Sequence, residues 1–430
     1  MRRLSLALVL CCTLLSRAGA ATAPDAAAAA AIDAWAKPLL ARGQLSGQLL
    51  VTRRGRVVVE RSWGSANAEL GVPVTPATRF NIASVTKPLT TTLAIQLAAE
   101  GRLRVSDTLA RWFPDFPKAD SITVSMLLRH RSGIPHEVVP DSEATRPFTA
   151  EELMERARRL PLDFPPGARE SYSSGGFEVL ARVLERVSGK PYDALLEERI
   201  FGPLGMTHSS SADSRVLLPG RASGYVPGPH GIENAPLQDF TSITGAGSVW
   251  STARDLSRFV DSVEAGRLGE GPRRSFDRDG RIDFNGRTGG FKAWVVRDSA
   301  SGVAAFFLSN LATGAPDALK TAILALAAGE SVAPPVIPVL AATAPADGEL
   351  RRWEGEFQIS GGGPRLSLHV RNGVLYANDW LLQPTADGAM FSPRDYGLVR
   401  AVPAADGSIQ RLDWTEGGQV YAAPRVGAAR

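Results

Sequence analysis

The sequence has almost no cysteine. Its 430 residues include two, Cys11 and Cys12, and both lie in the N-terminal segment MRRLSLALVLCCTLLSRAGA. If that segment is removed on export, the mature chain has no thiol, which excludes disulfides, cysteine nucleophiles and cysteine-ligated zinc. Core packing must then hold the fold together, and a hydrophobic content of 44% is ample for that.

Blocks of like charge are also missing. The formal net charge of +4 comes from 48 basic and 44 acidic residues that are mixed along the chain. Because no basic cluster with interleaved aromatic residues occurs, we expect no nucleic-acid partner. Metal-ligand spacings such as His-Glu-x-x-His are absent from the sequence, so we expect neither a metal nor another cofactor.

No apolar run near the N-terminus is long enough for a membrane-spanning helix. The run Leu4–Leu15 is shorter than the ~20 residues that such a helix needs, and the small residues Ala18–Ala20 follow it. This pattern predicts a signal peptide over residues 1–20, cleaved after Ala20, with an uncleaved anchor as the alternative. We therefore expect an exported protein, periplasmic or secreted, with no stable membrane insertion after cleavage.

Apolar periodicity predicts a first, α/β domain over residues 21–328. Two apolar runs joined around Arg54-Gly55 predict a β-hairpin, and later strands are indicated at 291–297 and 302–310. Helical patterns occupy the middle of the chain, and a last helix is expected over 315–328. This order predicts one sheet built from both ends of the domain, with a helical region inserted between them.

The remaining chain predicts a linker and a second domain. Residues 329–348 are rich in Pro, Ala and Val without any period, as expected of a linker. Short strand-like runs at close spacing follow, and Asn372-Gly373 is a strong signal for a two-residue hairpin. Residues 349–430 therefore predict a small, separate β domain.

A serine and a lysine three residues apart begin one of the helical patterns, in the stretch NIASVTKPLT. Positions i and i+3 share a helix face, so the amine of Lys87 can lie beside the hydroxyl of Ser84. Burial would lower the lysine pKa and let it take the serine proton, which makes Ser84 a candidate nucleophile. The alternative is that Ser84 only caps the helix, since serine is a favoured N-cap residue.

Two other segments could supply partners. Tyr172 lies among small polar residues in SYSSGG, where its hydroxyl could reach a cleft, although a half-buried tyrosine bonded to backbone is the simpler interpretation. The segment Gly286-Arg287-Thr288-Gly289-Gly290 combines a cation, a hydroxyl and glycines that allow close backbone approach. Such a segment could bind a substrate carboxylate at a sheet edge, or it could be only a turn.

In this order the segments resemble the serine β-lactamase and penicillin-binding protein superfamily. The resemblance is to the branch of class C β-lactamases, D-alanyl peptidases and related esterases, and it covers roughly residues 45–325. The segments that carry it are SGQLLVTRRGRVVVERSWGSANAELGVPVTPATRFNIASVTKPLTT, AAEGRLRVSDTLARWFPDFP, ITVSMLLRHRSGIP, YSSGGFEVLARVLERVSGKPY, IFGPLGMTHS, STARDLSRF and FFLSN.

The resemblance implies a fold and a set of roles. The fold is an α/β sandwich, in which helices flank a mainly antiparallel five-stranded sheet with an all-helical insertion, and a lipocalin-like β domain often follows. Ser84 resembles the acylated serine and Lys87 its proton-sharing partner. Tyr172 resembles the tyrosine of the Tyr-x-Asn motif, a base and proton route to the leaving group.

The third motif of the superfamily, Lys-Thr-Gly or His-x-Gly, is matched by Arg287, Thr288 and Gly289. On this alignment the backbone N–H groups of Ser84 and Gly290 are the implied oxyanion hole. The histidine of LLRHRSG, His130, corresponds to a structural loop residue in the superfamily.

Three features depart from the superfamily pattern. Ser174 stands where the second motif has asparagine, so we expect weaker handling of amides and β-lactams. Arg287 replaces lysine or histidine and keeps a charge for a carboxylate, but cannot donate a proton. The stretch from Trp250 to Arg287 is short, and the strand before the third motif is hard to find, so the sequence predicts either a trimmed sheet edge or a more open cleft.

These observations predict an exported serine hydrolase that forms an acyl-enzyme on Ser84. Its substrate is a small ester, a D-amino-acid peptide or a β-lactam, with Ser174, Arg287, Thr288, Gly289 and Gly290 as substrate-binding residues. The alternative is a non-catalytic or weakly catalytic protein that recognises cell-wall peptides. The oligomeric state is left open.

Overall fold

The computed structural model describes residues 23–427 except 212, 214 and 344. The predicted signal peptide, residues 1–20, lies outside the described residues. Within them, no helix combines the length and the apolar character needed to cross a membrane.

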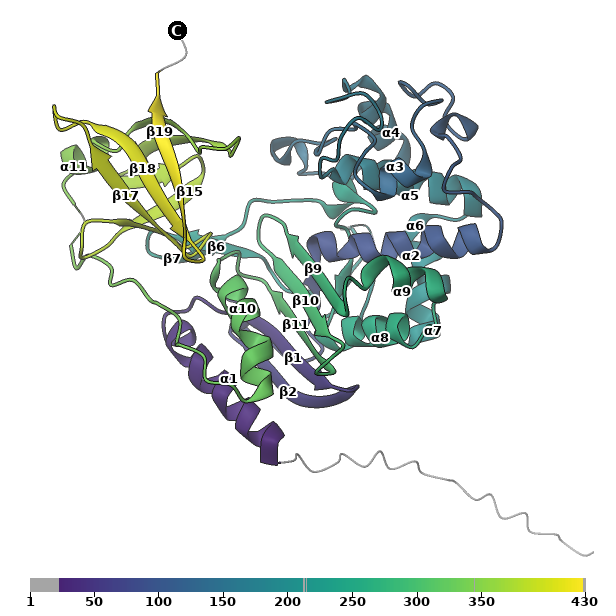
Figure 1. Cartoon of the computed structure of the whole chain (residues 1–430), viewed down its shortest axis with the longest axis horizontal. Coiled ribbons are helices and arrows are strands. Elements are labelled where there is room, and N and C mark those ends of the chain that lie inside the picture. Colours follow the sequence, from purple (N-terminus) through teal and green to yellow (C-terminus); the bar gives the residue numbers. More distant parts are fainter. Residues whose placement is uncertain (1–22, 212, 214, 344, 428–430) are drawn as a thin grey trace, which may run out of the picture.

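A five-stranded antiparallel sheet forms the centre of the first domain (Figure 1). The strand order is β2-β1-β11-β10-β9, so the N-terminal hairpin pairs with the last strand of the domain. Leu50 pairs with Phe306, for example, across more than 250 residues of chain. The five strands are β1 (Gly47–Arg53), β2 (Arg56–Trp63), β9 (Arg281–Arg287), β10 (Lys292–Asp298) and β11 (Val303–Ser309).

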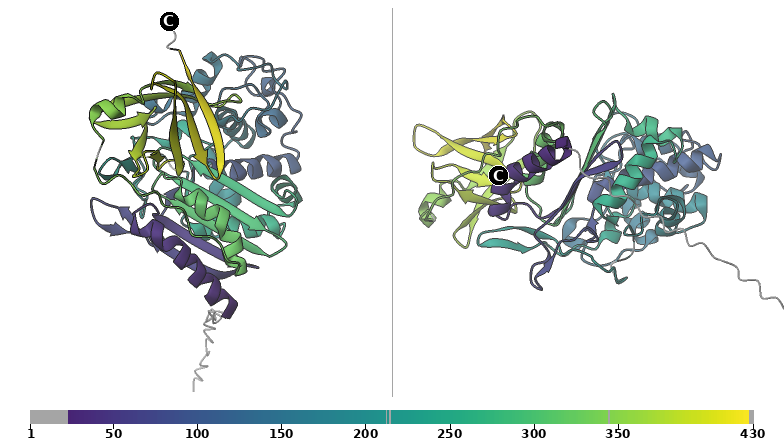
Figure 2. Two further views of the ribbon diagram at one scale, coloured as in Figure 1. Left: turned by 60° about the vertical axis from the view of Figure 1, so that its left-hand side comes forward. Right: turned by 90° about the horizontal axis from the view of Figure 1, so that it is seen from below.

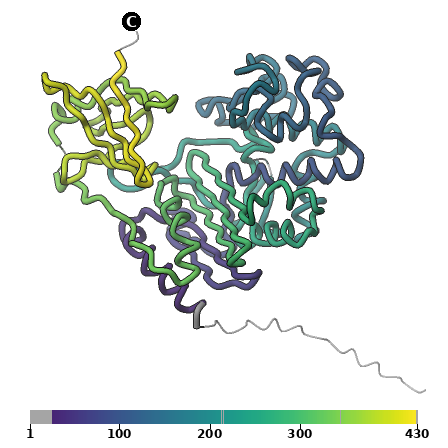
Figure 3. The backbone as a smooth tube through the Cα atoms, viewed as in Figure 1, coloured from purple at the N-terminus to yellow at the C-terminus, as the bar shows by residue number. Residues whose placement is uncertain are grey.

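Helices cover both faces of this sheet. On one face, α1 (Ala23–Ala41) and α10 (Ala315–Ala328) lie side by side, although they come from opposite ends of the domain (Figure 3). On the other face, α8 (Ala253–Glu264) packs against β1 and β11, and α2 (Thr86–Ala99) lies beyond it. Separate apolar cores fill the two sides because both faces of the central strands carry buried side chains.

The remaining helices of this domain belong mostly to the inserted region, around α2 and α5. The α-helices are α3 (Val124–Leu128), α4 (Ala150–Arg159), α5 (Ser174–Ser188), α6 (Tyr192–Leu196), α7 (Gly202–Leu204) and α9 (Glu270–Phe276). The other helical turns are η1 (Ala83–Val85), η2 (Leu109–Arg111), η3 (Asp141–Glu143), η4 (Glu197–Phe201) and η5 (Phe240–Ile243). Short paired strands join them: β3 (Ser65–Asn67) with β4 (Val72–Pro73), β5 (Phe80–Asn81) with β8 (Trp250–Ser251), and β6 (Tyr225–Gly228) with β7 (Gly231–Asn234).

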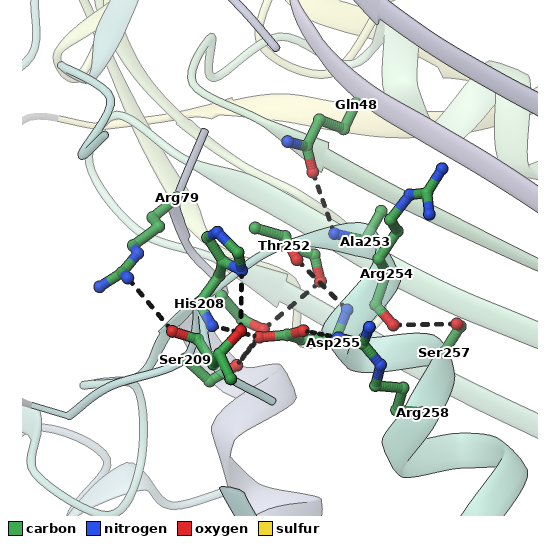
Figure 4. A network of polar contacts seen from close by, with 12 residues as sticks. Gln48, Arg79, His208, Ser209, Thr252, Ala253, Arg254, Asp255, Ser257 and Arg258 are labelled. Atoms are coloured by element: carbon green, nitrogen blue, oxygen red, sulfur yellow. Dashed lines mark hydrogen bonds and ion pairs between the residues drawn. The ribbon is translucent and has the colours of Figure 1, made fainter. Parts of the chain in front are cut away.

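A buried carboxylate connects α8 to the inserted region (Figure 4). Asp255 accepts hydrogen bonds from the backbone of His208 at 2.8 Å and from the hydroxyl of Ser209 at 3.0 Å, and Arg258 pairs with it. Thr252 caps the same helix by accepting the N–H of Asp255. Two of the segments that carry the family resemblance, around His208 and around Asp255, therefore meet here for structural reasons.

The sheet has a complete edge strand at the third motif. β9 pairs with β10 over its whole length, from Arg281 opposite Asp298 to Arg287 opposite Lys292. Phe284 packs against Phe276 of α9, which buries part of the strand that the sequence made hard to recognise. The expectation of a trimmed sheet edge is therefore wrong: the polar, glycine-containing sequence hides a strand because only alternate residues are buried.

The second domain is a closed, eight-stranded antiparallel barrel. Asn372 and Gly373 both have positive φ angles, 52° and 72°, as the predicted two-residue hairpin requires. After α11 (Asp347–Arg351) the strands are β12 (Gly355–Gln358), β13 (Arg365–Arg371), β14 (Val374–Ala377), β15 (Trp380–Pro384), β16 (Met390–Ser392), β17 (Gly397–Pro403), β18 (Ile409–Glu416) and β19 (Gln419–Val426). Sandwich and barrel together confirm the predicted fold.

The segment between α10 and the barrel makes hydrogen bonds to both domains. The indole N–H of Trp35 on α1 donates to the carbonyl of Ala333 at 2.9 Å. Further along, the N–H of Ala341 donates to Pro384 of the barrel, also at 2.9 Å. The barrel consequently lies on the side of the α/β domain that carries α1 and α10 (Figure 2).

Candidate active site

Ser84 lies on a strained turn between β5 and α2. The residue before it, Ala83, has a φ of 49°, which is unfavourable for a residue with a side chain. The side chain of Asn81 holds this turn: its oxygen accepts the N–H of Ala83 at 2.9 Å, and its amide donates to Gly247 at 2.9 Å. The hydroxyl of Ser84 makes no capping bond to α2, so the alternative interpretation of Ser84 as a helix cap is wrong.

Lys87 is buried beside Ser84, one helical turn further along. Its amine lies 3.0 Å from the Ser84 hydroxyl, 3.2 Å from the Ser174 hydroxyl and 3.0 Å from the carbonyl of Ala246. The side chain is 6% exposed, and this burial lowers the pKa of Lys87 to about 7. Near neutral pH, a substantial fraction of Lys87 is therefore uncharged and able to accept a proton.

Tyr172 approaches Ser84 from the loop before α5. Its hydroxyl donates to the Ser84 hydroxyl at 2.8 Å, and its ring lies against those of His130 and His136, with centroids 4.6 and 5.4 Å away. Both imidazoles accept backbone N–H bonds, from Ser173 and Ser174, and burial lowers their pKa values. Neutral histidines thus hold the tyrosine loop in place.

Partial burial also changes the ionisation of Tyr172, which is 49% exposed. Desolvation raises its pKa above the ordinary value, against the opposing effect of its bonds to Ser84 and Ser174. The hydroxyl therefore keeps its proton at neutral pH. It can pass that proton to a group bound at Ser84, but it is not a standing phenolate.

Behind Lys87, α5 carries the buried carboxyl group of Glu178. Glu178 is 3% exposed, and desolvation raises its pKa to about 8. Its charge favours the protonated form of Lys87, while Lys87 in turn favours the ionised form of Glu178. The sequence signal that could have identified Glu178 is its place in the largely apolar run FEVLARVL, where a carboxylate is unusual.

The third segment forms the turn between β9 and β10. The N–H of Thr288 donates to Phe291 at 3.0 Å, with Gly289 and Gly290 between them. The hydroxyl of Thr288 lies 3.4 Å from the side-chain oxygen of Asn81, on the side of the Ser84 turn. Gly290 packs instead against Gly224 and Ala235.

Gly286 is the glycine that contacts the nucleophile's backbone. A β-carbon there would lie 2.8 Å from the nitrogen of Ser84 and 2.5 Å from the carbonyl oxygen of Ile82, which real contacts do not allow. A β-carbon on Gly289 would meet nothing closer than 4.0 Å. The alternation of buried and exposed residues along β9 could have indicated Gly286, had the strand been recognised.

The structure thus brings together four of the eight predicted site residues through side-chain bonds: Ser84, Lys87, Tyr172 and Ser174. Thr288 lies next to their supporting turn, and Gly289 and Gly290 form the hairpin behind it. The side chain of Arg287 lies elsewhere, against Asp395 of the barrel. Among the described residues, no group of histidine, cysteine and acidic side chains could hold a metal ion.

Comparison with known proteins identifies the family of the chain. The sequence profile of the beta-lactamase family matches residues 32–330. Esterase EstB of Burkholderia gladioli is 30% identical over 281 residues, which are 56% of this chain and 71% of EstB. The D-alanyl-D-alanine-carboxypeptidase/endopeptidase AmpH of Escherichia coli is 29% identical over 276 residues, 60% of this chain and 68% of AmpH.

Solved structures share the fold. The D-amino acid amidase of Ochrobactrum anthropi superposes with a TM-score of 0.60 and 24% identity, covering 67% of this chain and 92% of the amidase. The chain spans only about half the length of the first two curated relatives that it matches in sequence, 56% of one and 46% of the other. The chain belongs to the beta-lactamase family of serine hydrolases.

Proposed function

We propose that the protein is exported and cleaves a small ester or a D-amino-acid amide or peptide by forming an acyl-enzyme on Ser84. One observation carries this proposal: the Ser84 hydroxyl is bonded at once to Lys87, at 3.0 Å, and to Tyr172, at 2.8 Å. A serine is a weak nucleophile until a neighbouring group accepts its proton. Here a buried amine with a pKa near 7 can accept it, and a neutral phenol can supply one.

In the first step, the Ser84 oxygen bonds to the substrate carbonyl carbon while its proton passes to the neutral amine of Lys87. The carbonyl π electrons move to the oxygen, giving a tetrahedral oxyanion. As the bond to the leaving group breaks, the Tyr172 hydroxyl donates a proton to the departing oxygen or nitrogen, and Lys87 restores the tyrosine proton through the Ser174 hydroxyl, which is bonded to both side chains. Water then attacks the acyl carbon, and the proton transfers run in reverse, so that Ser84 regains its proton and the acid is released.

The oxyanion needs donors that are fixed in place. We propose the N–H groups of Ser84 and Arg287. Support comes from the hairpin pattern: the N–H of Thr288 points across to Phe291, and neighbouring residues of an antiparallel strand alternate in direction, so the N–H of Arg287 points out from the sheet edge. Gly286 places that edge against the Ser84 turn. This assignment replaces Gly290, the donor implied by the resemblance.

Ser174 favours esters and simple amides over β-lactams. Its hydroxyl bonds to Lys87 at 3.2 Å, as a motif asparagine could, but it has no amide N–H₂ to orient a substrate carbonyl. The names of similar proteins, an esterase and a D-alanyl-D-alanine-carboxypeptidase, cover both preferred substrate classes. Export is proposed from the N-terminal pattern of residues 1–20 alone.

Covalent labelling tests the proposal. The folded mature chain should be labelled by a fluorophosphonate probe on one serine, and Ser84→Ala should lose the label. Ser257→Ala, which changes a serine on α8 bonded to its own helix, is the matched control and should keep it. A folded protein that reacts with neither a fluorophosphonate nor a fluorescent penicillin would contradict the proposed function.

A further inference from the structure

The end of β9 has two functional faces. Gly286 and Thr288 lie toward Ser84 and Asn81, as the close approach at Gly286 and the Thr288 hydroxyl contact show. Successive side chains of a strand point to opposite faces, so Arg287 points the other way. Asp283 shares that opposite face, where it pairs with Lys320 of α10.

On this face Arg287 meets the second domain. Its guanidinium lies 3.7 Å from the carboxylate of Asp395, in the loop between β16 and β17 of the barrel. The Asp395 side chain is 16% exposed and that of Arg287 is 35% exposed, so the pair is only partly open to water. Lys292, opposite Arg287 in the hairpin, is already engaged by Asp317 and by the carbonyl of Thr313.

The barrel loop is fixed in place beside Asp395. Its Pro393 carbonyl accepts the N–H of Gly314, just before α10, at 2.8 Å. A β-carbon on Gly314 would lie 2.5 Å from backbone atoms of Asp395 and Tyr396, so a glycine is needed for this approach. The Tyr396 hydroxyl donates to the side chain of Gln44 at 3.0 Å, and its ring packs on the core beside α1 and α10.

These contacts matter because β9 is an edge strand. Among the strands of the central sheet that the structure describes, only β10 pairs with β9, and the Ser84 turn packs against the face of β9 that carries Gly286. The last residue of the strand, Arg287, would otherwise be free to fray, as strand ends are. Asp395 pairs with the side chain of Arg287, and the backbone N–H of Arg287 is the proposed oxyanion donor.

We infer that Asp395 of the C-terminal barrel is a positioning residue of the active site, which fixes the oxyanion donor at Arg287 by pairing with its side chain. This inference rests on the proposed function. It makes the barrel part of the catalytic apparatus through Asp395, which acts on Arg287 and not on the substrate itself. Loss of the pair should weaken stabilisation of the transition state and leave binding of the substrate ground state almost unchanged.

The experiment compares two carboxamide variants of the full-length mature chain. Asp395→Asn removes the interdomain pair, and Asp387→Asn removes an exposed pair with Arg400 inside the barrel as the matched control. With a p-nitrophenyl ester, we expect Asp395→Asn to lower kcat roughly tenfold at constant KM, since complete removal of an oxyanion donor costs about 10²–10³. Asp387→Asn should behave as wild type, and Asp395→Glu should recover part of kcat.

The outcomes separate this inference from the proposed function. If wild type is labelled at Ser84 but Asp395→Asn keeps the wild-type kcat, the positioning role is wrong and the hydrolase proposal stands. If Asp395→Asn and Asp387→Asn lower kcat alike, the effect is a general one of the barrel and the inference is also wrong. Should Asp395→Asn fail to fold, Asp395→Glu must still show reduced kcat at constant KM, and a wild-type kcat there would overturn the inference.

Discussion

Two walls of the site are built in different ways. The helix wall, Ser84, Lys87, Tyr172 and Ser174, comes from α2, α5 and the turns before them, and its side chains bond to one another within 3.2 Å. The strand wall, Gly286 to Thr288, is the end of an edge strand and approaches Ser84 through its backbone. Side-chain chemistry thus defines one wall, and the absence of a side chain defines the other.

The largest effect is expected in the helix wall, from Lys87→Met. We expect ester hydrolysis to fall roughly 10²–10⁴-fold, because the proton acceptor is lost. The stability of the protein should not fall in parallel. Burial lowers the pKa of Lys87 in the folded state, so at pH 6 the folded wild type contains an unfavourable buried charge, and the methionine variant does not. Rates and thermal melts at pH 6 measure the two effects.

A proportional loss of activity and melting temperature would contradict that account. It would mean that Lys87 serves mainly to hold α2 in place through its bond to Ala246. Lys118→Met, which changes a lysine in a surface turn, serves as the control for replacement of a lysine by methionine.

The strand wall is tested by two glycine substitutions. Gly286→Ala places a methyl group against the Ser84 nitrogen and the Ile82 carbonyl and should lower kcat roughly 10–100-fold by displacing the edge. Gly289→Ala, in the same hairpin, meets nothing closer than 4.0 Å and should have little effect. Steady-state kinetics on both variants give the comparison, and equal losses would show that the close approach of Gly286 to Ser84 is not needed for catalysis.

A smaller effect distinguishes the buried charges behind the helix wall. Lys87 is active when neutral, so the rate constant for acylation should rise with pH through about 7. The charge of Glu178 raises the lysine pKa, but burial raises the pKa of Glu178 itself to about 8, so Glu178 is mostly protonated when Lys87 titrates and Glu178→Gln should move this limb only slightly to lower pH. Stopped-flow acylation across pH 5–9 measures the shift, and a large shift would mean that Glu178 is ionised when Lys87 titrates.

The smallest expected effect concerns substrate choice. Ser174→Asn adds an amide donor beside Lys87 and should raise the rate on a D-alanyl amide and a chromogenic cephalosporin severalfold relative to a p-nitrophenyl ester. A parallel rate panel with wild type measures the ratio. If the ratio does not change, Ser174 does not set the preference for esters.

Local patterns predicted the helix wall well. Ser84 and Lys87 are three residues apart on one helical start, so their contact follows from helix geometry. Tyr172 could be identified only through the resemblance, because a loop 88 residues away has no local signal. The histidine contacts that hold this loop, from His130 and His136, depend on tertiary packing and were not predicted.

The strand wall was predicted less well for a physical reason. A strand with one exposed face reads as polar sequence, and RIDFNGR shows no run of apolar residues. Without the strand there was no alternation to place Gly286 toward Ser84 and Arg287 away from it. The contact of Arg287 with Asp395 joins residues more than 100 positions apart in two domains, which no sequence period encodes.

The central claim is that Ser84 is acylated with the help of Lys87 and Tyr172. The most direct measurement is a rapid-quench reaction with a p-nitrophenyl ester, followed by mass analysis of the protein and its peptides. The account predicts a burst of about one p-nitrophenolate per chain and one acyl group on the peptide that contains Ser84. Two results would contradict the account. One is turnover with neither a burst nor a trapped acyl group, both in wild type and in Lys87→Met, and the other is an acyl group on a serine other than Ser84.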